Sequence, residues 1–177
     1  MFFRNLFFYT LPEISVVTNE ALESALQAAA LRPVGALAMQ SRGFVPPLGE
    51  SGALLQGIEN SLWLCLGGED RILPAAVVQR ECQLKIAELE QAKGHPLGKR
   101  ARAQLKQETL DTLMPRAFVK PSRLNAVINR KRGFIAIDSS SAKAAEALVS
   151  KLREALGSFP ALPLQAEQAP RSILTQF

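Results

Sequence analysis

Residues 93–132 read KGHPLGKRARAQLKQETLDTLMPRAFVKPSRLNAVINRKR, and this stretch decides both the organisation and the charge of the chain. It holds eleven lysines and arginines against two acids, Glu108 and Asp111, and so carries a net charge of +9. The rest of the chain has ten basic and fourteen acidic residues. A dense positive field from a minority of the residues favours a polyanion partner, such as a phosphate backbone. The alternative is a solvated basic surface that keeps the protein soluble.

Prolines and glycines divide this region into elements. Leu73-Pro74 favours a helix start, and apolar residues at helical spacing follow as far as Lys93. Gly94-His95-Pro96 breaks that helix, and a second helix is expected from about Gly98 until Pro115 stops it. The sequence therefore predicts a helical hairpin, residues 74–115, inserted between strands. Three cations share one face of its second helix: Lys99, Arg102 and Lys106.

The residues on either side of the hairpin alternate between strand and helix signals. Two further helices are expected, one after Thr18 or Asn19 and one that begins within residues 138–141 and ends before Gly157. The expected strands are residues 2–9, 36–45, 62–66, 117–119, 124–128 and 134–137. This order predicts an α+β fold, a mostly antiparallel sheet with packed helices. Residues 1–73 and 116–177 would form a central domain, and residues 74–115 an inserted helical tip domain.

Composition limits the class of protein. A chain of 177 residues with 47% hydrophobic content can bury a core. Cys65 lies in an apolar run and is expected to be buried, and two scattered cysteines, Cys65 and Cys82, favour a reducing compartment. Arg4 and Asn5 interrupt the apolar N-terminus, so no signal peptide is expected. No run reaches the length of a membrane span, and we expect a cytoplasmic protein.

The residues offer little for catalysis. The single histidine, His95, lies in a Gly-His-Pro turn, where packing or solvent exposure is favoured over a catalytic role. Phosphate-binding glycine loops of nucleotide-binding folds are absent from the sequence. One histidine and two distant cysteines do not make a zinc site. The pairs Glu69-Asp70 and Glu88/Glu90 do not converge into an acidic metal site. We therefore expect a protein that is not an enzyme and needs no metal or cofactor.

A surface that holds phosphate remains. Lysine and arginine on a helix face and at a hairpin tip can contact backbone oxygens without reading bases, and no motif for base readout is present. Phe118, between Arg116 and Lys120, could wedge between bases if it is exposed, but its strand position also fits core packing. The candidate DNA-contacting residues are Lys99, Arg100, Arg102, Lys106, Arg116, Phe118, Lys120, Arg123, Arg130, Lys131 and Arg132.

Several motifs along the whole chain resemble one known family. They are Phe3-Arg4-Asn5-Leu6 with Tyr9, Ser41-Arg42-Gly43-Phe44-Val45-Pro46-Pro47, Ile72-Leu73-Pro74, Leu113-Met114-Pro115-Arg116-Ala117-Phe118, and Ala155-Leu156-Gly157-Ser158 with Pro160 and Pro163. In this order they are similar to the recombination-associated protein RdgC family. Members of that family are longer, and the resemblance covers their central and tip domains without the C-terminal base domain.

The resemblance implies a bacterial, nucleoid-associated protein that binds DNA, mainly duplex, with little sequence preference. It implies a dimer that forms a ring around the duplex, with one contact through the tip helices, and that limits RecA by competing for DNA. It also implies that Phe118 is an exposed apolar finger near the DNA. It places Lys99, Arg100, Arg102, Lys106 and Arg116 on the family's basic tip helix and LPRAF segment.

One local departure from the family adds positive charge. Val127-Ile128-Asn129 stands where the family usually has Trp-Ile-Asp, and the turn that follows is Arg130-Lys131-Arg132. The change removes an acid beside a basic turn, so it should strengthen phosphate contact there. The alternative function is a protein-interaction module that docks an acidic partner through the basic helical hairpin.

Overall fold

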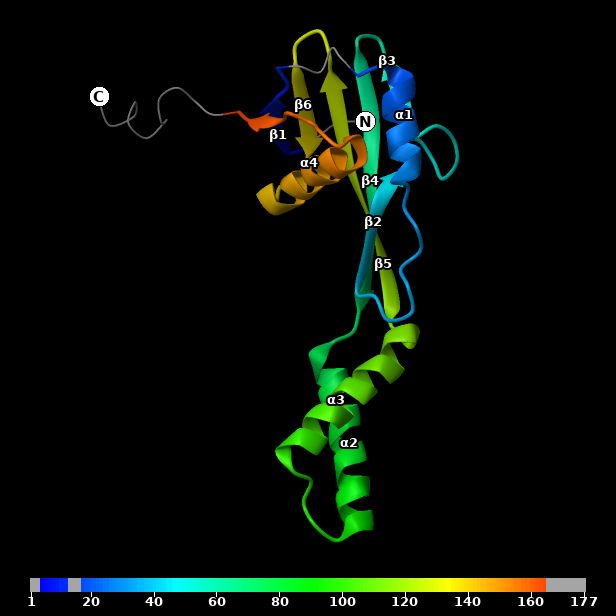
Figure 1. The fold of residues 1–177 in the computed structure, drawn as a ribbon, viewed down its shortest axis with the longest axis vertical. Coiled ribbons are helices and arrows are strands. Elements are labelled where there is room, and N and C mark those ends of the chain that lie inside the picture. The colour runs from blue at the N-terminus through cyan, green and yellow to red at the C-terminus, as the bar shows by residue number, and fades with distance from the viewer. Residues whose placement is uncertain (1–3, 13–16, 165–177) are drawn as a thin grey trace, which may run out of the picture. The chain divides into compact units, whose positions relative to one another are not determined.

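The computed structural model describes residues 4–12 and 17–164 (Figure 1). Its element order is β-α-β-β-β, two helices, then β-β-α-β. The sheet has seven strands in the order β2-β4-β5-β6-β1-β7, with β3 also paired to β4. The strands are β1 (Leu6–Thr10), β2 (Gln40–Val45), β3 (Leu55–Ile58), β4 (Ser61–Ile72), β5 (Phe118–Asn129), β6 (Phe134–Asp138) and β7 (Leu162–Pro163). The helices are α1 (Asn19–Ala28), α2 (Ala75–Lys93), α3 (Lys99–Leu113) and α4 (Ala142–Leu156), with a 3-10 turn η2 (Met114–Arg116).

The predicted α+β class with a mostly antiparallel sheet is confirmed. The pairs β1–β6, β1–β7, β3–β4 and β5–β6 are all antiparallel. The chain forms two compact units, residues 1–31, 43–67 and 123–177 in the first and residues 32–42 and 68–122 in the second. The second unit includes every residue of the hairpin predicted at 74–115 together with the adjoining parts of β2, β4 and β5. The assignment of a separate tip domain stays a prediction.

The core of the first unit lies between one face of the sheet and helices α1 and α4. Alternate residues of β6, Ile135 and Ile137, are fully buried in a cluster with Leu26 of α1 and Leu148 of α4. Strand β4 is apolar on both faces, and its Cys65 is fully buried, as predicted. β4 lies inside the sheet, where it pairs with β2, β3 and β5.

The predicted helix ends are confirmed, because they depend on local signals. The Thr18 hydroxyl accepts a hydrogen bond from the amide of Ala21 at 3.2 Å and caps α1. The Ser141 hydroxyl caps α4 in the same way through Ala144, at 3.3 Å. Gly94 and Gly157 follow α2 and α4 with left-handed φ values of 70° and 72°, which glycine adopts without steric cost.

The strand predictions need several corrections. The strand predicted at 36–45 begins only at Gln40, the strand predicted at 62–66 extends over residues 61–72, and β3 was not predicted. The strands predicted at 117–119 and 124–128 are one strand that runs through Pro121. The register of β5 with β6 covers residues 126–129 alone, so the missing N–H of Pro121 removes no hydrogen bond to β6. For the strand predicted at 2–9, residues 2 and 3 lie outside the described part of the chain, and β1 begins only at Leu6 and extends to Thr10.

Candidate nucleic-acid interface

Helix α3 of the second unit begins with three cations in its first turn, Lys99, Arg100 and Arg102, and has no acid there. Gly98, which precedes the helix, supplies no side-chain cap. Because the free N–H groups and the dipole make this end of a helix partly positive, cations placed here repel it. A bound anion offsets both unfavourable terms, and phosphate is a frequent ligand of helix N-termini.

Arg102 is partly committed within the hairpin. Its Nη2 lies 2.8 Å from Oε1 of Glu90, and the same oxygen accepts the amide of Leu97 at 2.8 Å. The hydrogen bond from Leu97, followed by the one from Arg102, lowers the pKa of the Glu90 carboxyl. Glu90 therefore ties the end of α2 to the start of α3.

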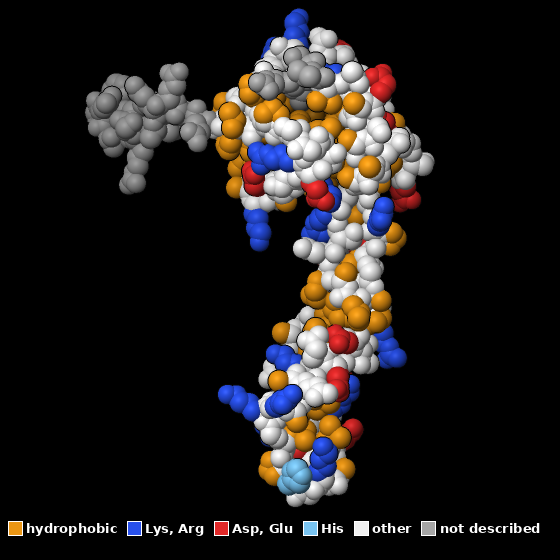
Figure 2. All heavy atoms as spheres, viewed as in Figure 1, with side chains coloured by type: hydrophobic (Ala, Val, Ile, Leu, Met, Phe, Trp, Pro, Cys, Tyr) orange, Lys and Arg blue, Asp and Glu red, His pale blue; other side chains and the backbone are white. Residues whose placement is uncertain are grey.

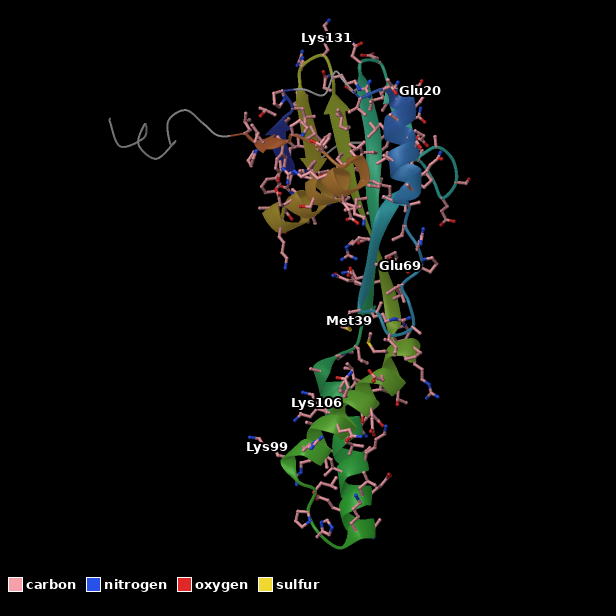
Figure 3. All side chains as sticks on the ribbon, viewed as in Figure 1. Glu20, Met39, Glu69, Lys99, Lys106 and Lys131 are labelled. Carbon is pink, nitrogen blue, oxygen red and sulfur yellow. The ribbon has the colours of Figure 1, made fainter. Side chains whose placement is uncertain are left out.

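Other cations of α3 are free to meet a ligand. Lys99, Arg100 and Lys106 are exposed, and none of them forms a salt bridge within the described residues. Figure 3 labels Lys99 and Lys106, which extend from α3 into solvent. Figure 2 shows blue Lys and Arg side chains among orange apolar ones over the α2–α3 hairpin. The spacing predicted to place Lys99, Arg102 and Lys106 on one face is thus present on a regular helix.

Phe118 is exposed. Its side chain has 83% relative exposure, at the first position of β5 and directly after the turn η2 and Ala117. The alternative of core packing for this residue is therefore wrong. Arg116 and Lys120, two residues to either side, are also exposed. An aromatic ring exposed between two cations has the form of an apolar wedge beside phosphate contacts.

Partly buried hydrogen bonds from Arg71 hold the backbone just before Phe118, and the sequence did not indicate them. The guanidinium Nη1 donates to the carbonyl oxygens of Met114 at 2.8 Å and Ala117 at 3.5 Å, and Nη2 donates to Gly35 at 3.2 Å. The amide of Arg71 also donates to Met39, at 2.8 Å. Arg71 lies outside the basic stretch, and its position directly before the Ile72-Leu73-Pro74 motif was the available signal.

In the first unit, Arg123 is engaged by the backbone. Its Nη2 donates to the carbonyl oxygen of Pro46 and its Nη1 to that of Gly49, at 3.4 Å for the latter. Burial raises the pKa of the nearby Cys65 thiol, and the charge of Arg123 opposes this increase. Arg123 thus fixes the loop after β2. Because its two terminal nitrogens already donate to this loop, Arg123 has fewer N–H groups left to contact a ligand.

The turn between β5 and β6 carries Arg130, Lys131 and Arg132. Lys131 is labelled at this turn in Figure 3, and it is exposed, as is Arg132, whereas Arg130 is half-buried. The amide of Arg132 donates to Oδ1 of Asn129 at 2.8 Å, which fixes the turn. The predicted basic hairpin tip is therefore formed.

The structure divides the predicted contact residues between the two units. Each unit therefore has its own group of cations. The second unit holds Lys99, Arg100, Arg102, Lys106, Arg116, Phe118 and Lys120, and the first holds Arg123, Arg130, Lys131 and Arg132. Their contact with DNA stays a prediction.

Other kinds of site have little support within the described part of the chain. His95 is exposed, with Nδ1 3.2 Å from the carbonyl oxygen of Pro96, as expected for a turn residue. Residues 4–12 and 17–164 contain no group of three or more His, Cys, Asp or Glu side chains placed to hold a metal ion. Among the helices described, none has the length and apolar character needed to cross a membrane.

The fold and these side chains define an α+β protein with two groups of cations suited to phosphate oxygens. A family model described as "Putative exonuclease, RdgC" matches residues 1–177. The chain belongs to the RdgC family, and the resemblance found in its motifs is confirmed.

Three relatives carry the name "Recombination-associated protein RdgC". That of Xanthomonas oryzae pv. oryzae is 48% identical over 177 residues, which cover 99% of this chain and 58% of the relative. That of Xanthomonas campestris pv. campestris gives the same values, 48%, 99% and 58%. That of Xylella fastidiosa is 47% identical over 179 residues, covering 100% of this chain and 59% of the relative. The chain thus spans less than two thirds of the length of these curated relatives.

Proposed function

We propose that this chain binds DNA through the phosphate backbone, without sequence preference, and that it modulates homologous recombination by limiting access of the RecA recombinase to DNA. The observation that carries the proposal is the first turn of α3, where three cations meet the positive end of a helix with no acid in the turn. A bound phosphate would offset the repulsion between these cations and the helix end, which gives a reason for three cations at this position. The names of the relatives support the link to recombination.

The proposed mechanism assigns two roles. The cations neutralise phosphates and release counterions, which supplies most of the binding free energy in sequence-independent complexes. Phe118 inserts its ring between bases, flanked by phosphate contacts from Arg116 and Lys120. A chain bound in this way covers duplex that a recombinase filament would otherwise occupy. Such a protein is nucleoid-associated in the cytoplasm.

We further propose a homodimer through the tip helices, and in longer family members a ring around the duplex. An apolar hollow of about 570 Å³ lies between α2 and α3 and supports this proposal. Val78 and Cys82 line it from α2 and Leu110 from α3, with Lys106 at its edge. Val77 and Leu84 of α2 are 44% and 52% exposed. A helical hairpin with this much unpaired apolar surface suits contact with another protein surface.

The test of DNA binding is a set of isotherms for a short duplex at several salt concentrations. We expect the affinity to fall steeply with salt, and the double variant Lys99→Gln/Lys106→Gln to reduce the slope of log affinity against log salt by about 2, since each phosphate contact contributes about 0.9. Lys143→Gln, which removes an exposed charge from α4 of the first unit, is the control and should leave the slope nearly unchanged. An affinity independent of salt would contradict the proposal.

The alternative function is a module that docks an acidic protein through the same hairpin, and the apolar hollow beside Lys106 favours it as the second candidate. Charge reversal at Lys99, Arg102 and Lys106 separates the two functions. It should abolish retention of DNA if the chain binds DNA, and it should abolish only partner capture if the hairpin docks an acidic protein.

The proposed activity is non-enzymatic, although the family description includes the word exonuclease. Among the described residues, no cluster of carboxylate side chains is placed to hold a metal ion as in a nuclease. We expect linear and plasmid DNA to remain intact in the presence of Mg²⁺ or Mn²⁺. Metal-dependent cleavage by the purified chain would contradict this part of the proposal.

A further inference from the structure

The turn between β5 and β6 borders a hollow of about 390 Å³ in the first unit. The wall is made by Arg130 to Gly133 of the turn and by Thr10 to Pro12 at the end of β1. Three consecutive residues of this wall are cations, and none of the lining residues is an acid. The hollow therefore concentrates positive charge around a small concave space.

Hydrogen bonds that do not use the cationic side chains fix the shape of this turn. The amide of Leu11 donates to the carbonyl oxygen of Gly133 at 2.8 Å and joins the two walls. Asn129 accepts the amide of Arg132 at 2.8 Å and donates to the hydroxyl of Ser61 at 3.0 Å. Gly133 takes a φ of 61°, which favours glycine. The backbone of the turn is thus held in place, and the charges of its three cations are not neutralised by any described salt bridge.

Arg130 supplies a second, independent observation. Its Nε and Nη2 atoms are buried and have no hydrogen-bond partner among the described residues. These two nitrogens lie on the same edge of the guanidinium, the edge that pairs with two oxygens of one anion. Buried donors in a protein are rarely left without a partner, and charged donors least of all.

We propose that this hollow is a phosphate-binding site. The Nε/Nη2 edge of Arg130 donates two parallel hydrogen bonds to two oxygens of a phosphate group, while Lys131 and Arg132 neutralise its charge. Arg130 lines the hollow, and because both nitrogens are buried, binding requires its side chain to change rotamer so that this edge faces the ligand. Three positive charges match a phosphate, which carries up to two negative charges, better than a singly charged carboxylate. The site does not depend on the DNA-binding proposal, since it can hold a free phosphate.

Titration of the full chain with inorganic phosphate tests the site, with chloride used to match ionic strength. The probe is the Nε–H resonances of the ¹⁵N-labelled arginines. We expect one resonance to shift saturably in the wild type. Arg130→Lys keeps the charge but loses the paired donors, and we expect it to bind phosphate about tenfold or more weakly. Lys143→Gln is the matched control and should bind like the wild type. Equal affinity of the wild type and Arg130→Lys, or no saturable shift, overturns the proposal.

In the sequence the acid Glu13 follows Pro12, and it lies outside the described residues. The same titration of Glu13→Gln tests whether this acid is the internal partner of Arg130. If it is, the wild type binds no phosphate and Glu13→Gln gains binding, which overturns the proposal. Similar affinity in both proteins supports it.

Two sources of phosphate are distinguished with short duplexes that end in 5′-phosphate or 5′-hydroxyl. A weaker binding of Arg130→Lys to the 5′-phosphate duplex alone identifies a terminal phosphate, and an equal loss with both duplexes identifies the backbone phosphodiester. Both results support the site. If no duplex binds but inorganic phosphate still shifts the Arg130 resonance, the phosphate site stands and the DNA-binding proposal fails.

Discussion

Nη1 of Arg71 donates a 2.8 Å hydrogen bond to the carbonyl oxygen of Met114, where α3 passes into the turn η2. The last carbonyl groups of a helix lack partners within the helix, and a cation that meets them also interacts favourably with the helix dipole. The same guanidinium reaches Ala117, the residue before Phe118. One side chain from the end of β4 therefore fixes both the end of α3 and the start of β5.

Arg71→Met should destabilise the second unit by about 1–3 kcal/mol, because it leaves carbonyl oxygens near Arg71 without their donor. Urea unfolding followed by the signal of helices α2 and α3 measures this. Arg80→Met on α2, an exposed arginine without a described salt bridge, is the control and should change the stability by less than about 0.5 kcal/mol. If both variants unfold at the same urea concentration, Arg71 does not have this structural role.

Phe118→Ala should weaken DNA binding and leave the stability nearly unchanged. A side chain with 83% exposure contributes little burial to the fold, whereas a ring in contact with bases contributes about 1–3 kcal/mol, or roughly tenfold or more in affinity. Fluorescence anisotropy with a labelled duplex, paired with thermal unfolding, separates the two effects. Leu84→Ala, a truncation on α2 with 52% exposure, serves as the control. Lower stability without weaker binding would show that the ring has a structural role.

Local signals in the sequence were sufficient for the helices. Thr18 begins α1 through a side-chain contact three residues along the chain, and Gly94 and Gly157 end α2 and α4 through a left-handed backbone angle. Residue types that favour these local features can be recognised in the sequence. Strand lengths depend on pairing partners that sequence does not show. Strand β3 contains Gly57 and has no alternating pattern, and it is a strand because it pairs with β4 from Leu55↔Leu64 to Ile58↔Ser61.

The sequence was sufficient to predict which charged residues belong to the candidate site, but not how they are arranged in space. The charge of α3 and of the β5–β6 turn is visible in the sequence, and so are the cations at Lys99 and Lys131. The carbonyl contacts of Arg71 and Arg123 join residues 36 to 77 positions apart, so no local pattern indicates that these arginines are structural. Local patterns also could not assign the contact residues to two units, because this depends on how β2, β4 and β5 are shared between the units.

Gly43→Ala should destabilise the first unit by about 1–3 kcal/mol or more, the range for forced overpacking. A Cβ at Gly43 would overlap the backbone of Ala30 and Leu31, where Phe44 exchanges hydrogen bonds with Ala29 and Leu31 at 3.0 and 2.9 Å. Denaturant unfolding measures the loss. Gly57→Ala is the matched control, because a Cβ there meets open space, and an equal loss in both variants would contradict close backbone packing at Gly43.

Glu90 should make the α2–α3 hairpin sensitive to acid. Its amide bond from Leu97 and its pair with Arg102 lower the pKa of the carboxyl in the folded state. A carboxyl of this kind stabilises the fold above its ordinary pKa of about 4.3, and the contribution is lost as the pH falls through the lowered pKa. We therefore expect the wild type to melt at a higher temperature than Glu90→Gln near neutral pH, and the difference to disappear in acid. Glu88→Gln, which changes an exposed acid two residues earlier, should show no such pH-dependent difference. A gap between wild type and Glu90→Gln that is the same at both pH values would mean that the charge of Glu90 does not hold the two helices together.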